Sequence, residues 1–231
     1  VTVDVVATDE AGNTGAATGT IVIDVTGPTV GLDALTTNDT TPALTGTIDD
    51  PTATVVVTVE GVDYTATNNG DGTWTLADDT LPVLAEGNVT VDVVATDEAG
   101  NTGAATGTIV IDVTAPAVTL DALTTNDTTP ALTGTIDDPT ATVVVTVEGV
   151  DYTATNNGDG TWTLADDTLP VLAEGNVAVS VLATDTDGNT GNTSGTIIID
   201  VTAPAVSLEA LTTNDTTPAL TGTIDDPTAT V

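Results

Sequence analysis

The chain has 231 residues, and its 35 Asp and Glu residues are opposed by no Lys, Arg or His, which gives a formal net charge of −35. This composition excludes nucleic-acid binding and attraction to an anionic membrane, because no side chain can neutralise a phosphate. Catalysis through His or Cys and zinc binding by thiolate or imidazole are excluded as well, since the sequence contains no Cys. The natural partner of such a chain is a hard cation.

The hydrophobic content predicts a folded protein rather than an acidic disordered tail. Hydrophobic residues make up 39% of the chain, whereas disorder normally combines high charge with low hydrophobicity. The 56 Thr residues, together with Val and Ile, fill the sequence with β-branched side chains that favour strands. No apolar run approaches the length of about 18 residues that a membrane-spanning helix needs. We therefore expect an all-β protein without direct membrane insertion.

An internal repeat organises the sequence. Residues 1–13 return unchanged at 89–101 and with changes at 177–189, so the period is 88 residues. Leu32–Val89 is identical to Leu120–Val177 at all 58 positions. A period of this length is typical of whole domains, since solenoid units have about 20–50 residues. The sequence therefore indicates an array of near-identical domains, and we interpret the chain as an interior window of a longer protein.

Proline residues at strand ends predict the domain boundaries. The pairs Gly27-Pro28, Ala115-Pro116 and Ala203-Pro204 recur at the same position of the repeat. Two complete domains are expected at 28–115 and 116–203. Residues 1–27 are expected to be the C-terminal part of a preceding domain, and residues 204–231 the N-terminal part of a following one.

Each repeat is predicted to contain seven short strands. In the second repeat, alternation and turn residues place them at 117–123, 131–136, 142–147, 152–155, 162–164, 177–184 and 196–201. Apolar side chains alternate along 177–184, which is typical of a sheet with one buried face. Trp162 and Tyr152 are expected in or beside the core. Seven such strands in about 88 residues predict an immunoglobulin-like β-sandwich, without the antibody disulfide because Cys is absent.

Three phrases of the sequence resemble a known family. They are Ala-Thr-Asp-Glu-Ala-Gly-Asn at 95–101, Ile-Asp-Val-Thr-Ala-Pro at 111–116 and Asn-Gly-Asp-Gly-Thr-Trp at 157–162. Over its whole length the chain resembles the tandem bacterial Ig-like domains that form the extender regions of giant secreted RTX or biofilm-associated adhesins. The resemblance implies an array of β-sandwiches, type I secretion, attachment to the bacterial cell surface and calcium at the domain junctions.

Chain direction predicts where acidic side chains gather. Because strands alternate in direction, the loops after the second, fourth and sixth strands lie at the end of the domain where its first strand begins. That end meets the last strand of the preceding domain, so acids from both domains converge without a basic partner. Calcium takes six to eight oxygen ligands, which carboxylates and amides supply. The predicted ligands are Asp24, Asp49, Asp50, Asp97 and Asn101 at the first junction, and Asp112, Asp137, Asp138, Asp185, Asp187 and Asn189 at the second.

These acidic motifs also have purely structural interpretations, which the sequence leaves open. Asp137 and Asp138 precede a Pro and are typical of turn residues that cap backbone amides. Residues 97–101 are also consistent with a mere hairpin connection that holds Asn and Gly in left-handed geometry. The phrase 157–160 is expected to be a turn, and Asp166-Asp167 a solvated loop.

The leading functional prediction is mechanical. An extracellular rod on the bacterial surface would gain length from repeated domains and stiffness from cations at their joints. The alternative is a subunit of an extracellular filament or surface layer, in which these domains associate laterally or end to end. An enzyme with paired carboxylates is not expected, because every acid pair recurs in each repeat and no insertion builds a cleft.

Overall fold

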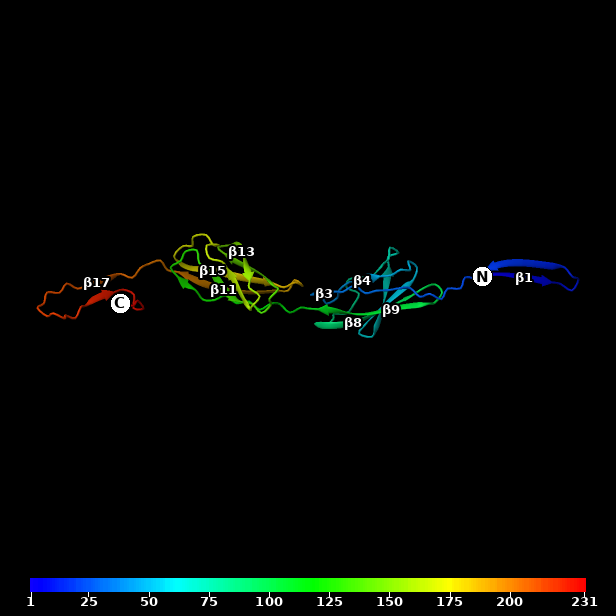
Figure 1. Cartoon of the computed structure of the whole chain (residues 1–231), viewed down its shortest axis with the longest axis horizontal. Helices are drawn as coiled ribbons and strands as arrows, with labels where there is room; N and C mark the ends of the chain where they lie inside the picture. The colour runs from blue at the N-terminus through cyan, green and yellow to red at the C-terminus, as the bar shows by residue number, and fades with distance from the viewer. The chain divides into compact units, whose positions relative to one another are not determined.

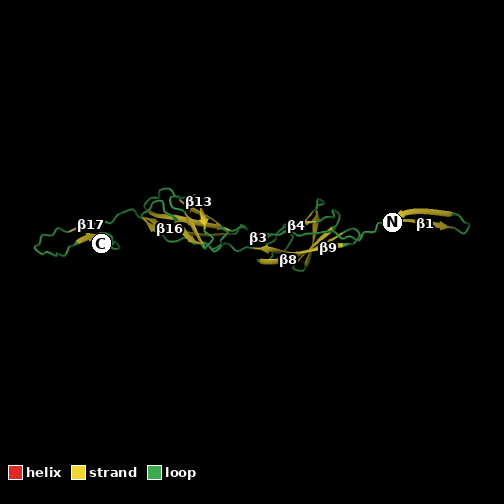
Figure 2. Cartoon of the chain, viewed as in Figure 1, coloured by secondary structure: helices red, strands yellow, loops and turns green.

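The computed structural model describes all residues from 1 to 231, and Figure 2 shows that they form strands and loops without a helix. Consequently no helix is long and apolar enough to cross a membrane. The chain divides into two compact units, Val1–Thr114 and Ala115–Val231. Each unit contains one seven-stranded domain and one two-stranded terminal segment (Figure 1).

The two units have equivalent strands. The first contains β1 (Thr2–Thr8), β2 (Thr14–Thr20), β3 (Thr36–Thr37), β4 (Leu44–Thr47), β5 (Thr54–Val59), β6 (Val62–Asn68), β7 (Thr73–Leu76), β8 (Gly87–Thr96) and β9 (Thr102–Ile111). The second contains β10 (Thr124–Thr125), β11 (Leu132–Thr135), β12 (Thr142–Val147), β13 (Val150–Asn156), β14 (Thr161–Leu164), β15 (Gly175–Thr184), β16 (Thr190–Ile199), β17 (Val206–Leu208) and β18 (Gly222–Ile224).

Each domain is a sandwich of two sheets. In the first domain the strand order is β3-β9-β8-β5-β6-β7-β4, and β6 belongs to both layers. Its first part pairs with β5, from Val62 to Ala66, whereas Thr67 and Asn68 pair with β7. The order β10-β16-β15-β12-β13-β14-β11 repeats this arrangement in the second domain. The all-β, tandem immunoglobulin-like fold expected from the sequence is confirmed.

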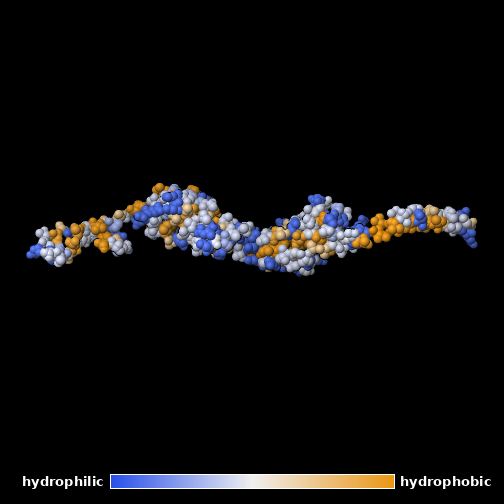
Figure 3. All heavy atoms as spheres, in the orientation of Figure 1, coloured by the Kyte–Doolittle hydropathy of each residue, from blue (hydrophilic) through white to orange (hydrophobic).

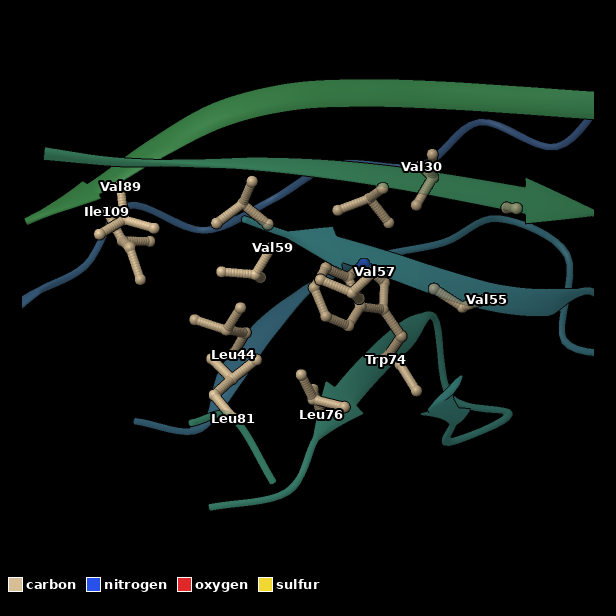
Figure 4. Packing of buried hydrophobic residues seen from close by; sticks show 14 of the residues in the cluster. Val30, Leu44, Val55, Val57, Val59, Trp74, Leu76, Leu81, Val89 and Ile109 are labelled. Carbon is tan, nitrogen blue, oxygen red and sulfur yellow. The ribbon is translucent and has the colours of Figure 1, made fainter. Parts of the chain in front are cut away.

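Each domain has its own hydrophobic core of Val, Ile, Leu, Ala and one Trp. Figure 4 shows this core in the first domain. Along β15 the alternating residues 177, 179, 181 and 183 are buried, as their period of two predicts. Trp74 is fully buried, and its indole Nε1 donates a 2.8 Å hydrogen bond to the carbonyl oxygen of Gly31. Trp162 donates in the same way to Thr119, while Tyr152 is half-buried against the core. The expectation that these aromatic residues serve the core is confirmed.

The first predicted strand, 117–123, is wrong as a continuous element. Only Val118 forms a bridge, with Ile136, and the short strand β10 then pairs in parallel with β16. The chain crosses between the two sheets in this stretch: Asp121 N donates to Thr133 of one sheet, whereas Leu123 O accepts from Ile198 of the other. This crossing interrupts the ladder and explains why no long strand forms.

The last strand is longer than predicted. It was expected at 196–201, but β16 begins at Thr190 and pairs with β15 over its full length, from Thr184↔Thr190 to Gly175↔Ile199. Its first half is rich in Thr, Gly, Asn and Ser and carries no apolar alternation. Pairing with β15 places this stretch in the sheet although its own sequence does not indicate a strand.

Candidate functional site

The loop between β8 and β9 is closed by its own side chains. Asp97 Oδ1 accepts from the backbone N–H of Asn101 at 2.8 Å, and Asp97 Oδ2 accepts from Asn101 Nδ2 at 2.8 Å. Gly100 has a φ of 90°, a conformation that favours glycine. The hydrogen bonds from Asn101 lower the pKa of Asp97 below its ordinary value. The local conformation is thus the hairpin connection that one interpretation of this motif expects, and Asp97 is ionised at neutral pH.

The loop after β4 presents the next two acidic side chains. Asp49 Oδ1 accepts from the backbone N–H of Thr29 at 2.6 Å, and this bond lowers the pKa of Asp49. Asp50 Oδ1 accepts from both the backbone N–H and the hydroxyl of Thr52 at 2.8 Å. Both carboxylates therefore cap backbone amides. In each carboxylate these capping bonds engage the Oδ1 atom.

The linker before the first domain, residues 24–28, lies directly against the end of that domain that carries the β8–β9 loop. Asn101 Nδ2 donates a 3.2 Å hydrogen bond to the carbonyl oxygen of Asp24. A Cβ atom at Gly103 would lie 1.7 Å from the Pro28 carbonyl oxygen, and one at Gly27 would lie 2.4 Å from that of Thr102. Real Cβ atoms do not make contacts this short. The two backbones can therefore approach so closely only because residues 27 and 103 are glycines.

These three segments together surround an open depression of about 340 Å³. Its lining is Asp24, Thr26, Gly27, Pro28, Asp49, Asp50, Pro51 and Asp97. Four carboxylates thus face one hollow in a chain that has no Lys, Arg or His to balance them. No three of them are gathered closely enough to hold a metal ion in this arrangement. Binding a cation would therefore require rotation of the side chains toward the centre.

Four residues of the lining, Thr26, Gly27, Pro28 and Pro51, are not among the predicted site residues. Thr26 N–H donates to Asp24 Oδ1 at 3.0 Å and so orients that carboxylate within the linker. Pro51 follows Asp49 and Asp50 and lines the same hollow. The signal for Thr26 is present in the sequence, because an Asp-Val-Thr phrase precedes each linker Pro at 24–26, 112–114 and 200–202.

The second predicted set repeats these local structures within its own units. Asp137 Oδ1 accepts from Ala117 N–H at 2.7 Å, and Asp138 Oδ1 accepts from the N–H and hydroxyl of Thr140 at 2.7 Å. Asp185 accepts from the backbone N–H of Asp187 at 2.9 Å and from both amide groups of Asn189 at 2.8 Å. Burial raises the pKa of Asp185, but the hydrogen bonds outweigh it and lower the pKa overall. Asp112, in the other unit, accepts from Thr114 N–H at 3.0 Å, and its partnership with this set stays a prediction.

Elsewhere on the surface, threonine hydroxyls take the place of basic side chains. Thr58 donates to Asp63 at 2.7 Å, Thr106 to Asp92 at 2.6 Å and Thr45 to Asp33 at 2.8 Å, each pair on or beside neighbouring strands. The second domain repeats two of these pairs, between Thr146 and Asp151 and between Thr133 and Asp121. The abundance of Thr in the sequence is therefore explained in part by the need of the carboxylates for neutral donors.

Fold and repeat define a tandem array of immunoglobulin-like β-sandwich domains. The sequence profile of the bacterial Ig-like domain family matches residues 31–113 and 119–201. The chain belongs to this family, and the resemblance to bacterial Ig-like domains stated from the sequence is confirmed.

Solved structures of adhesin segments are similar to the chain. A tetra-tandem repeat from the extending region of a large adhesion protein is 26% identical with a TM-score of 0.38, and the alignment covers 96% of this chain and 69% of that one. A Ca²⁺-stabilized adhesin with which an Antarctic bacterium binds ice is 25% identical, with a TM-score of 0.43 and coverage of 93% and 61%. A structure from a 1.5-MDa bacterial ice-binding adhesin is 23% identical, with a TM-score of 0.42 and coverage of 86% and 74%. No curated protein matches the sequence.

Proposed function

We propose that the chain is part of the extender, or stalk, of a calcium-rigidified adhesin on the bacterial cell surface. Such a stalk holds an adhesive region away from the cell for attachment or biofilm formation. Membership of the bacterial Ig-like family and the near-identity of the two domains support this proposal. Copies of one domain add length, whereas a specialised binding function would favour differences between them.

The observation that carries the proposal is the acidic depression where the linker meets the first domain. Asp24 belongs to the linker, whereas Asp49, Asp50 and Asp97 belong to two loops of the domain. A cation held between these carboxylates would join the linker to the domain. Calcium prefers hard oxygen ligands. The Oδ2 atoms of Asp49 and Asp50, which lie outside the capping bonds, and the side-chain amide oxygen of Asn101 are ligands of this kind.

Calcium bound there would supply the positive charge that the chain itself lacks. Residues 28–115 contain 14 acidic and no basic side chains, so self-repulsion opposes the approach of the linker to the loops. Asp24, Asp49, Asp50, Asp97 and Asn101 would hold the ion at the first junction. The equivalent set at the second is Asp112, Asp137, Asp138, Asp185, Asp187 and Asn189. Removing the repulsion and adding a bridge would restrict bending at each joint.

An extracellular location agrees with such sites. They are open and solvated, and exposed calcium sites of extracellular modules bind with Kd values of about 10⁻⁴–10⁻³ M. The linker residues are few, so a bridging ion can determine the angle of the joint. The stalk would then be stiff in calcium-rich surroundings and flexible where calcium is scarce.

Small-angle X-ray scattering of the chain in excess calcium and in chelator tests this proposal. We expect calcium to increase the maximum dimension and to sharpen the profile of a rigid particle. Asp138→Ala and Asp185→Ala should reduce this response, because each removes a ligand at the second junction. Asp166→Ala, in a loop outside the predicted set, is the matched control and should respond like the parent.

Two outcomes would count against the proposal. If the parent chain scatters identically in calcium and chelator, calcium does not stiffen it. If all three variants stiffen as the parent does, the joint is held by packing or by the proline linker. A calcium-dependent rise in molecular mass would instead support the filament or surface-layer alternative.

A further inference from the structure

The segment that leads into the first domain, residues 29–37, forms hydrogen bonds first with one sheet and then with the other. Its first part lies along β4, where Gly31 N–H donates to Thr47 O at 2.9 Å and Asp33 N–H donates to Thr45 O at 3.0 Å. Its second part, β3, lies along β9 and is parallel to it, with Thr36 opposite Val110 and Thr37 opposite Ile111. The bonds from Val110 N–H to Leu35 O and from Asp112 N–H to Thr37 O, both 2.9 Å, extend this pairing.

The parallel direction of β3 and β9 determines how the domain meets a stretching force. The chain enters the domain shortly before β3 and leaves it directly after β9. A pull on the two ends therefore draws these neighbouring strands in opposite directions along their common axis. Their hydrogen bonds are loaded in shear and must fail together. An antiparallel terminal pair would be peeled from one end, so that its bonds would break one at a time.

We propose that the β3–β9 pairing is a mechanical clamp that sets the resistance of the domain to stretching. The strands between these two along the chain can be drawn out only after the clamp has opened. The indole of Trp74 adds a second anchor, because its bond to the Gly31 carbonyl fixes the leading segment to the core.

The second domain contains the same device. β10 is parallel to β16, Ile198 N–H donates to Leu123 O at 2.9 Å and Asp200 N–H donates to Thr125 O at 2.8 Å. The clamp is a property of the folded domain and does not depend on the proposed role of the chain as a stalk. A stalk would need the property, however, because every domain in a tandem array carries the full tension.

Single-molecule force spectroscopy on the full chain tests the clamp. The absence of Cys allows one Cys added at each end to serve as a unique attachment point. Val110→Pro removes the N–H that donates to Leu35, on the side of β9 that faces β3 rather than β8. At constant force the unfolding rate of this domain should rise about tenfold, the effect of losing one hydrogen bond from the barrier. The unchanged second domain gives a reference in the same trace.

Two control variants separate the clamp from general stability. Ala104→Pro lies on the same edge of β9, but no backbone bond to β3 involves Ala104, so the unfolding rate under force should stay near that of the parent. Leu81→Ala removes a buried side chain from a loop outside the loaded strands and should lower urea stability more than it speeds unfolding under force. Equal rates for Val110→Pro and Ala104→Pro would overturn the clamp. So would a Val110→Pro effect that Leu81→Ala reproduces at equal loss of stability.

Discussion

Two regions of the molecule have the same sequence and very different surroundings. Residues 1–26 are identical to residues 89–114, and each stretch forms an antiparallel hairpin with the same register, Thr8↔Thr14 in one and Thr96↔Thr102 in the other. The loops match as well, because Asp9 accepts from both amide groups of Asn13 at 2.8 Å. Hairpin direction, register and loop geometry are therefore determined locally.

The two hairpins differ in how far their apolar side chains are buried. Ile109 and Ile111 are 0% and 1% exposed within the first domain, whereas the equivalent Ile21 and Ile23 are 53% and 70% exposed. Figure 3 shows the apolar side chains that the segment before the first domain leaves on its surface. The pairing itself is alike up to Ile21, whose N–H donates to the Val1 carbonyl oxygen at 2.7 Å, as Ile109 pairs with Val89 in the domain. An isolated hairpin has no second layer against which to bury its apolar face. In the domain the hairpin is stabilised by the strands that pack against it.

The largest effect should come from the same mutation made in both hairpins. Ile111→Ala leaves a cavity in the core, so we expect the domain to lose about 2–5 kcal/mol of unfolding free energy. Ile23→Ala removes a side chain that already faces solvent and should change unfolding by less than about 0.5 kcal/mol. Urea unfolding of the full chain, followed by Trp fluorescence, measures both. A loss from Ile23→Ala as large as that from Ile111→Ala would show that the first hairpin is equally packed.

A smaller difference is expected at the glycines of these hairpins. A Cβ at Gly103 would clash with the Pro28 carbonyl, whereas one at the equivalent Gly15 meets nothing within 4 Å. Gly103→Ala should therefore destabilise the domain by about 1–3 kcal/mol, as overpacking does. Gly15→Ala should be close to neutral. Thermal unfolding of the two variants gives the comparison, and equal melting temperatures would contradict the tight contact between linker and β9.

The smallest difference concerns pH. Hydrogen bonds from Asn13 and Asn101 lower the pKa of Asp9 and Asp97 below the ordinary value of 3.8. A depressed folded-state pKa stabilises the fold above the unfolded value, and this contribution is lost as pH falls through the folded value. Both residues should titrate below free Asp in an NMR pH titration. Only protonation of Asp97 should lower the stability of a complete domain, so Asp97→Asn should weaken the acid dependence while Asp9→Asn leaves it unchanged.

Much of the fold was predictable because its elements are local. The alternation along 177–184 identified the buried face of β15, and turn residues located most of the other strands. The crossing of the leading segment at Leu120–Leu123 was not predictable, because it depends on which sheet supplies the next hydrogen bonds. The first half of β16 was missed for a similar reason: its Thr and Gly residues join the sheet through their partner in β15.

The sequence allowed a prediction of which loops form the candidate site, but not of how their side chains are hydrogen-bonded. Strand alternation predicts Asp49, Asp50 and Asp97 at the end of the domain that meets the linker, and all three line one hollow with Asp24. Sequence could not show that Thr29, Thr52 and Asn101 engage one or both oxygens of these carboxylates. Those bonds depend on side-chain rotamers within loops, and they decide which oxygen atoms remain for a cation.

The identical loops at 9–13 and 97–101 also provide the most direct test of calcium at the junction. Both have the same ligands, but only the second faces Asp24, Asp49 and Asp50. A calcium titration followed through the side-chain amide resonances of Asn13 and Asn101 compares them within one molecule. We predict saturable shifts for Asn101 at millimolar or lower calcium and little change for Asn13. Equal shifts for the two, or none for Asn101, would contradict a calcium site built by the linker and the domain together.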